Sequence, residues 1–200
     1  MADIVIVDTL IRRNRLGPCY SVKLIDYYLR AAGLNCKVVQ ARDAAKSCAQ
    51  FADEILALKP SIAGFCCYAC NYADVLMLSR VLKRKKPSLK VMLGGPQATF
   101  TAEETLRKFN CVDAVVLGEC DGRIAAVTRA LLSGGEEALA RAGGIVFRDS
   151  RGRVRKFPFS GNDFDIDRLP LLDWNDCMEP GGSLQIDIES GRGCLHKCAY

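Results

Sequence analysis

The chain has 200 residues, of which 50% are hydrophobic and 26% charged, and its formal net charge at pH 7 is +5. This composition excludes a disordered, collagen-like or low-complexity protein, and a chain of this length folds without disulfide or metal cross-links. The small net charge does not indicate nucleic-acid binding, no apolar run is long enough to cross a membrane, and the N-terminus lacks the pattern of a secretion signal. We therefore expect a soluble, cytoplasmic protein that binds neither nucleic acid nor membranes.

Short apolar runs and segments of helical periodicity alternate from the N-terminus onward. The strands predicted from the apolar runs span residues 3–7, 36–40, 61–66, 89–93 and 112–117. The helices predicted from the periodicity span residues 19–32, 47–58, 72–86, 101–108 and 121–132. Ser47 is a candidate N-cap, Gly33 marks a helix end, and Thr101 with Glu104 matches a capping box. This alternation predicts an α/β fold with a doubly wound, mainly parallel, Rossmann-like sheet.

The pattern changes after residue 140. Residues 144–148 and 154–157 predict a β-hairpin, and the following stretch, rich in Pro, Asp and Gly, indicates a linker. A further strand is predicted at 183–189, and it leads into a loop rich in glycine and cysteine. We therefore expect a sheet domain at 1–140, a hairpin and linker at 141–182, and the start of another domain at 183–200.

Doubly wound sheets bind ligands beyond the carboxyl ends of their strands, which here are followed by loops at 8–18, 67–71, 94–100 and 118–121. Gly94-Gly95-Pro96 follows one buried strand, and Gly118-Glu119-Cys120 follows the next. Each run alone is also compatible with a plain turn or a helix cap. Two glycine-bearing loops at one edge nevertheless predict a cleft with bare backbone walls, suited to a large planar or extended ligand. Neither the Gly-x-Gly-x-x-Gly fingerprint nor a phosphate-loop lysine motif occurs.

The cysteines are numerous, 11 in all, and most lie in apolar runs that favour buried free thiols. Cys67 and Cys70 form a Cys-x-x-Cys pair without further zinc ligands nearby, and we interpret it as part of a loop that lines the cleft. Cys194 and Cys198 lie on a glycine-rich loop of the kind that holds an iron–sulfur cluster, although two unrelated thiols are an alternative. The single histidine, His196, excludes a histidine-based triad on the sheet.

Several stretches resemble one enzyme family. Residues 60–65, 91–99 and 112–119 resemble the cobalamin-binding domain of cobalamin-dependent radical S-adenosylmethionine (SAM) enzymes. Residues 166–173 resemble the strap that leads into the catalytic barrel of these enzymes. Residues 191–200 resemble the start of their Cys-x-x-x-Cys-x-x-Cys motif, whose third cysteine would be residue 201. The resemblance thus implies that the strand at 183–189 begins a truncated radical SAM barrel.

The resemblance also implies residue roles. Cobalamin would insert its dimethylbenzimidazole tail into the cleft, Cys194 and Cys198 would ligate a 4Fe–4S cluster, and Tyr200 would lie against the adenine of SAM. Cys67, Tyr68 and Asn71 would face the corrin. The other residues expected at the cobalamin are Gly94, Gly95, Pro96 and Gln97 along the tail, and Gly118, Glu119 and Cys120 beside the nucleotide loop and the ring edge.

Two departures from the family pattern concern the cobalamin site. The Asp-x-His-x-x-Gly motif that supplies an axial histidine in methionine-synthase-like proteins is absent, so cobalt would lack a protein histidine ligand. The acidic loop reads Gly-Glu-Cys-Asp, where the family usually has Gly-Glu-Gly-Glu.

By resemblance, the reduced cluster would split SAM into a 5′-deoxyadenosyl radical, and methylcobalamin would deliver a methyl group to a substrate carbon. We expect the cobalamin-binding portion of a methyltransferase that acts on a small-molecule or peptide substrate and receives electrons from a flavodoxin or ferredoxin. These 200 residues alone should bind cobalamin without catalysis. The alternatives are a radical SAM cyclase or other cobalamin-dependent rearrangement, and a stand-alone cobalamin carrier or sensor. A flavodoxin-like or receiver-like domain is disfavoured, because neither a hydroxyl-rich phosphate loop nor an acidic pocket with a partner lysine is evident.

Overall fold

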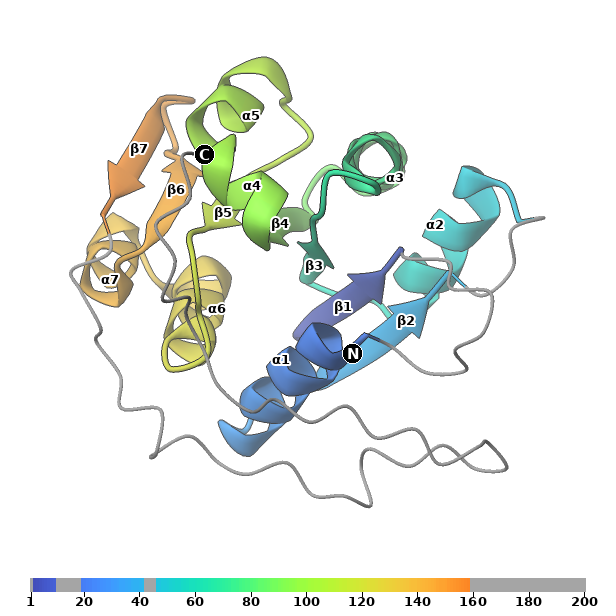
Figure 1. Ribbon diagram of the computed structural model, residues 1–200, viewed down its shortest axis with the longest axis horizontal. Helices are drawn as coiled ribbons and strands as arrows, with labels where there is room; N and C mark the ends of the chain where they lie inside the picture. The colour runs from blue at the N-terminus through green and yellow to red at the C-terminus, as the bar shows by residue number, and fades with distance from the viewer. Residues whose placement is uncertain (1, 10–18, 42–45, 159–200) are drawn as a thin grey trace, which may run out of the picture.

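The computed structural model describes residues 2–9, 19–41 and 46–158 of the chain (Figure 1). The predictions for the linker after Pro158, for the strand at 183–189, and for Cys194, Cys198 and Tyr200 lie outside these described residues.

The described residues form one seven-stranded sheet with the order β2-β1-β3-β4-β5-β6-β7. The parallel strands β1 to β5 span Ile4–Asp8, Cys36–Gln40, Ile62–Cys66, Lys90–Gly94 and Ala114–Val116. Strands β6 (Ile145–Arg148) and β7 (Val154–Phe157) form the predicted hairpin and continue the sheet as antiparallel strands. The predicted doubly wound, mainly parallel sheet is therefore confirmed. Its switch point lies between β1 and β3, where such sheets bind their ligands.

Helices pack on both faces of the sheet (Figure 1). One face carries α1 (Tyr20–Ala31), α6 (Ile124–Ser133) and α7 (Glu136–Ala142). The opposite face carries α2 (Cys48–Ala57), α3 (Tyr72–Lys85), α4 (Pro96–Phe100) and α5 (Ala102–Lys108). Helices α4 and α7 were not predicted; α4 has only 5 residues, which is too short to show a helical period.

Two helix starts that the sequence predicted have different outcomes. Ser47 caps α2 as predicted: its hydroxyl accepts a hydrogen bond from the backbone N–H of Gln50, and the Gln50 side chain accepts one from the Ser47 N–H. The capping box predicted at Thr101 is wrong, because no side-chain cap bond forms there. Helix α4 leads directly into α5, and the Thr101 hydroxyl donates instead to the Gln97 carbonyl at 2.8 Å.

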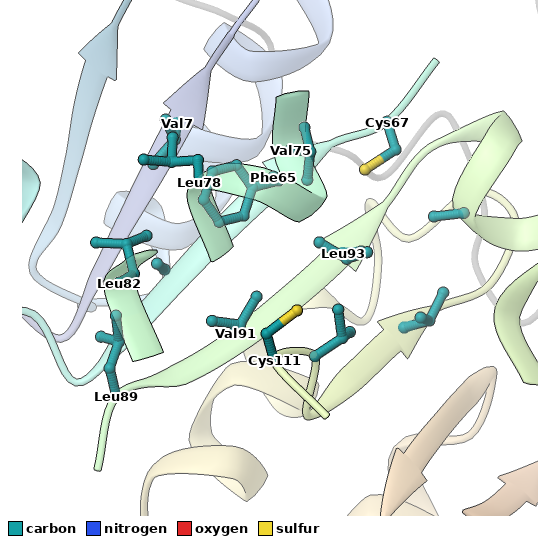
Figure 2. Packing of buried hydrophobic residues seen from close by; sticks show 14 of the residues in the cluster. Val7, Phe65, Cys67, Val75, Leu78, Leu82, Leu89, Val91, Leu93 and Cys111 are labelled. Atoms are coloured by element: carbon teal, nitrogen blue, oxygen red, sulfur yellow. The ribbon is translucent and has the colours of Figure 1, made fainter. Parts of the chain in front are cut away.

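Side chains alternate between the two faces along each buried strand. Ile4 and Ile6 of β1 pack under α1 and α6, whereas Val5 and Val7 pack under the helices of the other face. Cys67, directly after β3, belongs to this second cluster, and Figure 2 shows its side chain among the buried residues there. Its side chain has no solvent exposure (0%). The prediction that Cys67 faces the ligand cleft is therefore wrong.

The burial of Cys67 predicts a contrast in thiol reactivity with Cys70. Burial raises the pKa of Cys67 far above its usual range, so this thiol stays protonated and inaccessible, whereas Cys70 is exposed. Iodoacetamide at pH 8 should alkylate Cys70 in the native protein and leave Cys67 unmodified, as read by tandem mass spectrometry. Both residues should react in urea. Equal labelling of the two in the native state would contradict this packing.

The cap at Ser47 predicts a stability difference. Replacing Ser47 with Ala removes the acceptor for the Gln50 N–H and should lower the free energy of unfolding by about 1 kcal/mol. Ser133→Ala is the matched control, because that hydroxyl is exposed at the end of α6 and bonds only to the Arg129 carbonyl. Urea titration should show less than about 0.5 kcal/mol for this control. Equal losses for both variants would show that the cap is not the cause.

Candidate functional site

The candidate site is a cavity of about 260 Å³ on the sheet face that carries α1 and α6. Four adjacent strands supply its floor, through Ile6, Gly64, Met92 and Val116. Helix α1 and Ile124 of α6 form its side walls. The loops that follow β3, β4 and β5 surround the mouth, so the cavity lies at the predicted edge of the sheet.

Gly64 gives the floor of the cavity its depth. It lies in the middle of β3, between Ile6 of β1 and Met92 of β4 in the strand register. An added Cβ would lie 2.8 Å from Ile6 Cδ1 and 3.7 Å from Met92 Cε, so a side chain here would take up space at the cavity floor and force Ile6 to shift. The sequence analysis missed Gly64, although a glycine inside an apolar strand signals a close approach of another group.

Gly94 and Gly95 lie at the mouth, where the sequence predicted a cleft wall. A Cβ on Gly94 would meet no atom within 4 Å, so this position borders open space. Gly95 has φ +90°, and its Cβ would lie 2.8 Å from the Cys67 carbonyl oxygen. Glycine is therefore required at position 95 for both conformation and space. Pro96 also lines the cavity and begins α4.

Gln97 does not line the cavity. Its backbone N–H donates to the Cys67 carbonyl at 3.1 Å, and the Cys67 N–H donates to the Gly94 carbonyl at 2.8 Å. The role that the structure supports for Gln97 is thus to anchor the loop after β4 through its backbone.

The loop after β5 supplies the opposite glycine-bearing segment. Gly118, Glu119 and Cys120 all line the cavity, as does Asp121. Gly118 has φ +59°, and its N–H donates to the Thr99 hydroxyl at 3.0 Å. This bond ties the loop after β5 to α4, so the two loops that the sequence singled out form one continuous rim.

A small polar network joins α1 to the end of β3 at the rim. The Ser21 hydroxyl lies 3.4 Å from the Tyr68 hydroxyl, 3.7 Å from Cys66 Sγ and 3.3 Å from Cys19 Sγ. Ser21, Cys66 and Tyr68 line the cavity. Tyr68, which the resemblance places against the corrin, therefore lies at the mouth of the cavity, and Cys66 rather than Cys67 lines it.

Burial shifts the titration of these groups. It raises the pKa of the Cys66 thiol and of the Tyr68 hydroxyl. Burial, followed by the Asp121 carboxylate, raises the pKa of Cys120 to about 12. The thiols and the phenol are therefore uncharged at neutral pH, and thiols in this state are poor nucleophiles and poor metal ligands.

Asn71 braces the loop after β3 from inside the protein. Its side-chain oxygen accepts from the Tyr68 N–H at 2.7 Å, and its amide nitrogen donates to the Cys66 carbonyl at 2.9 Å and to the Thr9 hydroxyl at 3.0 Å. The side chain is buried and fully engaged in these bonds. The prediction that Asn71 faces the ligand is therefore wrong, because its polar atoms hold the loop that presents Tyr68.

Within residues 2–9, 19–41 and 46–158, no group of three or more His, Cys, Asp or Glu side chains is placed to hold a metal ion. In the same part of the chain, no helix has the length and apolar character needed to span a membrane.

Comparison with known proteins identifies similar chains. Over 147 residues the chain is 27% identical to an uncharacterized methyltransferase of Pyrococcus horikoshii, which covers 70% of this chain and 31% of that protein. Over 129 residues it is 29% identical to an anaerobic magnesium-protoporphyrin IX monomethyl ester cyclase of a Synechocystis species, covering 63% and 26%. The chain thus spans about a third or less of the length of these relatives.

Solved structures show the same fold. The radical S-adenosylmethionine methyltransferase TsrM from Kitasatospora setae, with cobalamin and a [4Fe-4S] cluster bound, matches with a TM-score of 0.63 and 16% identity over 79% of this chain and 31% of that one. The cobalamin-dependent radical enzyme OxsB, with aqua-cobalamin bound, also matches with a TM-score of 0.63, at 16% identity, over 80% of this chain and 23% of that one.

The family assignment rests on a direct sequence match. Residues 10–128 match the model of the B12-binding domain, and this range covers more than half of the chain, including β2 to β5 and every loop at the mouth of the cavity. The chain belongs to the B12-binding domain family.

Proposed function

We propose that the chain binds cobalamin with the base of its nucleotide tail in the cavity between α1 and α6, as the cobalamin-binding part of a larger radical SAM enzyme. The observation that carries the proposal is the side-chain-free mouth at Gly94, where a Cβ would meet open space. An extended tail can enter there between two loops of bare backbone.

The cavity suits a flat apolar base. Its floor presents Ile6, Met92 and Val116 around Gly64. An aromatic ring system bound there would remove from water both its own apolar surface and that of the cavity floor. A volume of about 260 Å³ is below the usual range for whole drug-sized ligands, which is about 300–1,000 Å³. It therefore fits the tail of cobalamin, with the corrin ring outside the mouth.

The polar groups at the mouth fit a tail that is oriented by hydrogen bonds. Ser21 and Tyr68 offer hydroxyl groups, and Cys66 and Cys120 offer uncharged thiols. Burial raises the pKa of both thiols and keeps them protonated, so they would act as hydrogen-bonding groups toward the tail and would be poor metal ligands. When bound, cobalamin supplies a cobalt centre that can carry a methyl group. The residues of this chain bind and orient the tail and exclude water from its base.

Methyl transfer is the first candidate for the activity of the whole protein. Support comes from the relative in Pyrococcus horikoshii and from TsrM, both of which carry the name methyltransferase. Under this proposal Cys194 and Cys198 hold a [4Fe–4S] cluster and Tyr200 lies beside SAM, as their match to the radical SAM motif implies. Ring formation is the second candidate, favoured by the likeness to the cyclases of Synechocystis and of Rubrivivax gelatinosus.

The binding proposal predicts that Gly94→Leu weakens the binding of hydroxocobalamin. The leucine Cβ would meet no protein atom within 4 Å and the side chain would take up space at the mouth, so affinity should fall more than about tenfold while the fold persists. Equilibrium dialysis with detection of the corrin absorbance measures this loss.

Gly135→Leu is the matched control, because a Cβ there also meets no atom within 4 Å, its φ is −92°, and the residue does not line the cavity. This variant should bind like the unmodified chain, with both variants melting near its temperature. Failure of the unmodified chain to hold any corrinoid would overturn the proposed function. If Gly94→Leu binds hydroxocobalamin as tightly as the unmodified chain, the nucleotide tail does not enter at Gly94.

A further inference from the structure

Arg123 is buried behind the loop that follows β5. Only 7% of its surface is exposed. Its guanidinium donates to the carbonyls of Leu117 at 2.5 Å and Glu119 at 2.7 Å, and to those of Gly143 at 3.3 Å and Gly144 at 3.1 Å. The side chain therefore joins the cavity loop to the turn between α7 and β6.

The position of this cation is unfavourable on local grounds. Arg123 is the N-cap residue of α6, and the N-terminus of a helix favours anions over cations. A buried guanidinium also loses its hydrogen bonds to water, and hydrogen bonds to the protein have to replace them. The four carbonyl oxygens accept from Nη1 and Nη2, so these hydrogen bonds last only while both backbone segments keep their present shape.

The turn before β6 is fitted to the guanidinium. Gly144 has φ +55°, and a Cβ built on it would lie 1.5 Å from Arg123 Nη1. Only glycine adopts this conformation easily and leaves room for the flat group at the same time. Two backbone segments, residues 117–119 and residues 143–144, are thus matched to one side chain.

The same loop forms part of the cavity. Gly118 and Glu119 line the mouth, and the Gly118 N–H donates to the Thr99 hydroxyl, whereas Arg123 itself does not line the cavity. We propose that Arg123 is a positioning residue for corrinoid binding: it holds the Leu117–Glu119 loop in the shape that receives the nucleotide tail, without contacting the ligand. This inference rests on the proposed function.

The test compares two corrinoids that differ in the tail. Cobinamide has the corrin ring but lacks the nucleotide base, so it does not use the cavity. Arg123→Met should weaken cobalamin binding by about tenfold, because an unclamped loop has to be ordered during binding. Cobinamide binding should stay unchanged. Gly144→Ala displaces the guanidinium while keeping its charge, and it should produce the same selective loss if Arg123→Met fails to fold.

Two further variants sharpen the comparison. Arg123→Lys keeps the charge but cannot reach all four carbonyls, so its loss should be intermediate. Arg129→Met removes an exposed arginine of the same helix, whose guanidinium bonds the Ala32 carbonyl, and should leave both affinities unchanged. We call Arg123→Met and Gly144→Ala the clamp variants. If they weaken the binding of both corrinoids equally, Arg123 has a general structural role and the proposal is overturned. Unchanged cobalamin binding in these variants would also overturn it.

Hydrogen exchange separates failure of the clamp from failure of the proposed function. In the ligand-free protein, the Gly118 amide should exchange faster in Arg123→Met and in Gly144→Ala than in the unmodified chain, and at the same rate in Arg129→Met. If the unmodified chain binds no corrinoid, the proposed function fails, and the ligand role of Arg123 fails with it. If the chain binds cobalamin but the Gly118 exchange is unaffected by both clamp variants, the positioning role alone is overturned.

Discussion

Along a strand buried on both faces, consecutive side chains must point to opposite sides, and this constraint assigns every central residue of the sheet to one of two cores. In β1 the assignment separates Ile4 and Ile6 from Val5 and Val7. In β3 it places Gly64 on the side of α1 and α6, so the absence of a side chain creates space on that face only. The position of the cavity therefore depends on which strand residue is a glycine and on which face of the sheet that residue lies.

The alternation of side chains between the two faces also explains where prediction from the sequence succeeded and where it failed. The order and type of the long elements follow from hydrophobic periodicity, and they agree with the structure. The mouth of the cavity was predictable because glycine runs directly follow buried strands at Gly94 and Gly118. The choice between Cys66 and Cys67 was not, because a one-residue shift at the end of a strand moves a side chain to the other core.

The remaining differences arise from contacts that no local pattern reports. The Thr101 hydroxyl donates to the Gln97 carbonyl of α4 and does not cap α5, because the unpredicted helix α4 leads directly into α5. Asn71 has the residue type of a ligand contact, but its partners are backbone groups and Thr9, 62 positions away. Arg123 looks like an ordinary surface arginine in the sequence, and only the fold shows that carbonyls about twenty residues away surround it.

The fit between Arg123 and Gly144 links two positions in the history of the sequence. Any substitution that adds a Cβ at position 144 leaves no room for a guanidinium in its present place, while a shorter side chain at position 123 removes the steric reason for glycine there and leaves only the conformational one, φ +55°. Among descendants of a common ancestor, the two positions are therefore expected to change together or not at all. Such paired replacement would appear as covariation between residues 21 apart, one directly before α6 and the other after α7 in the sequence.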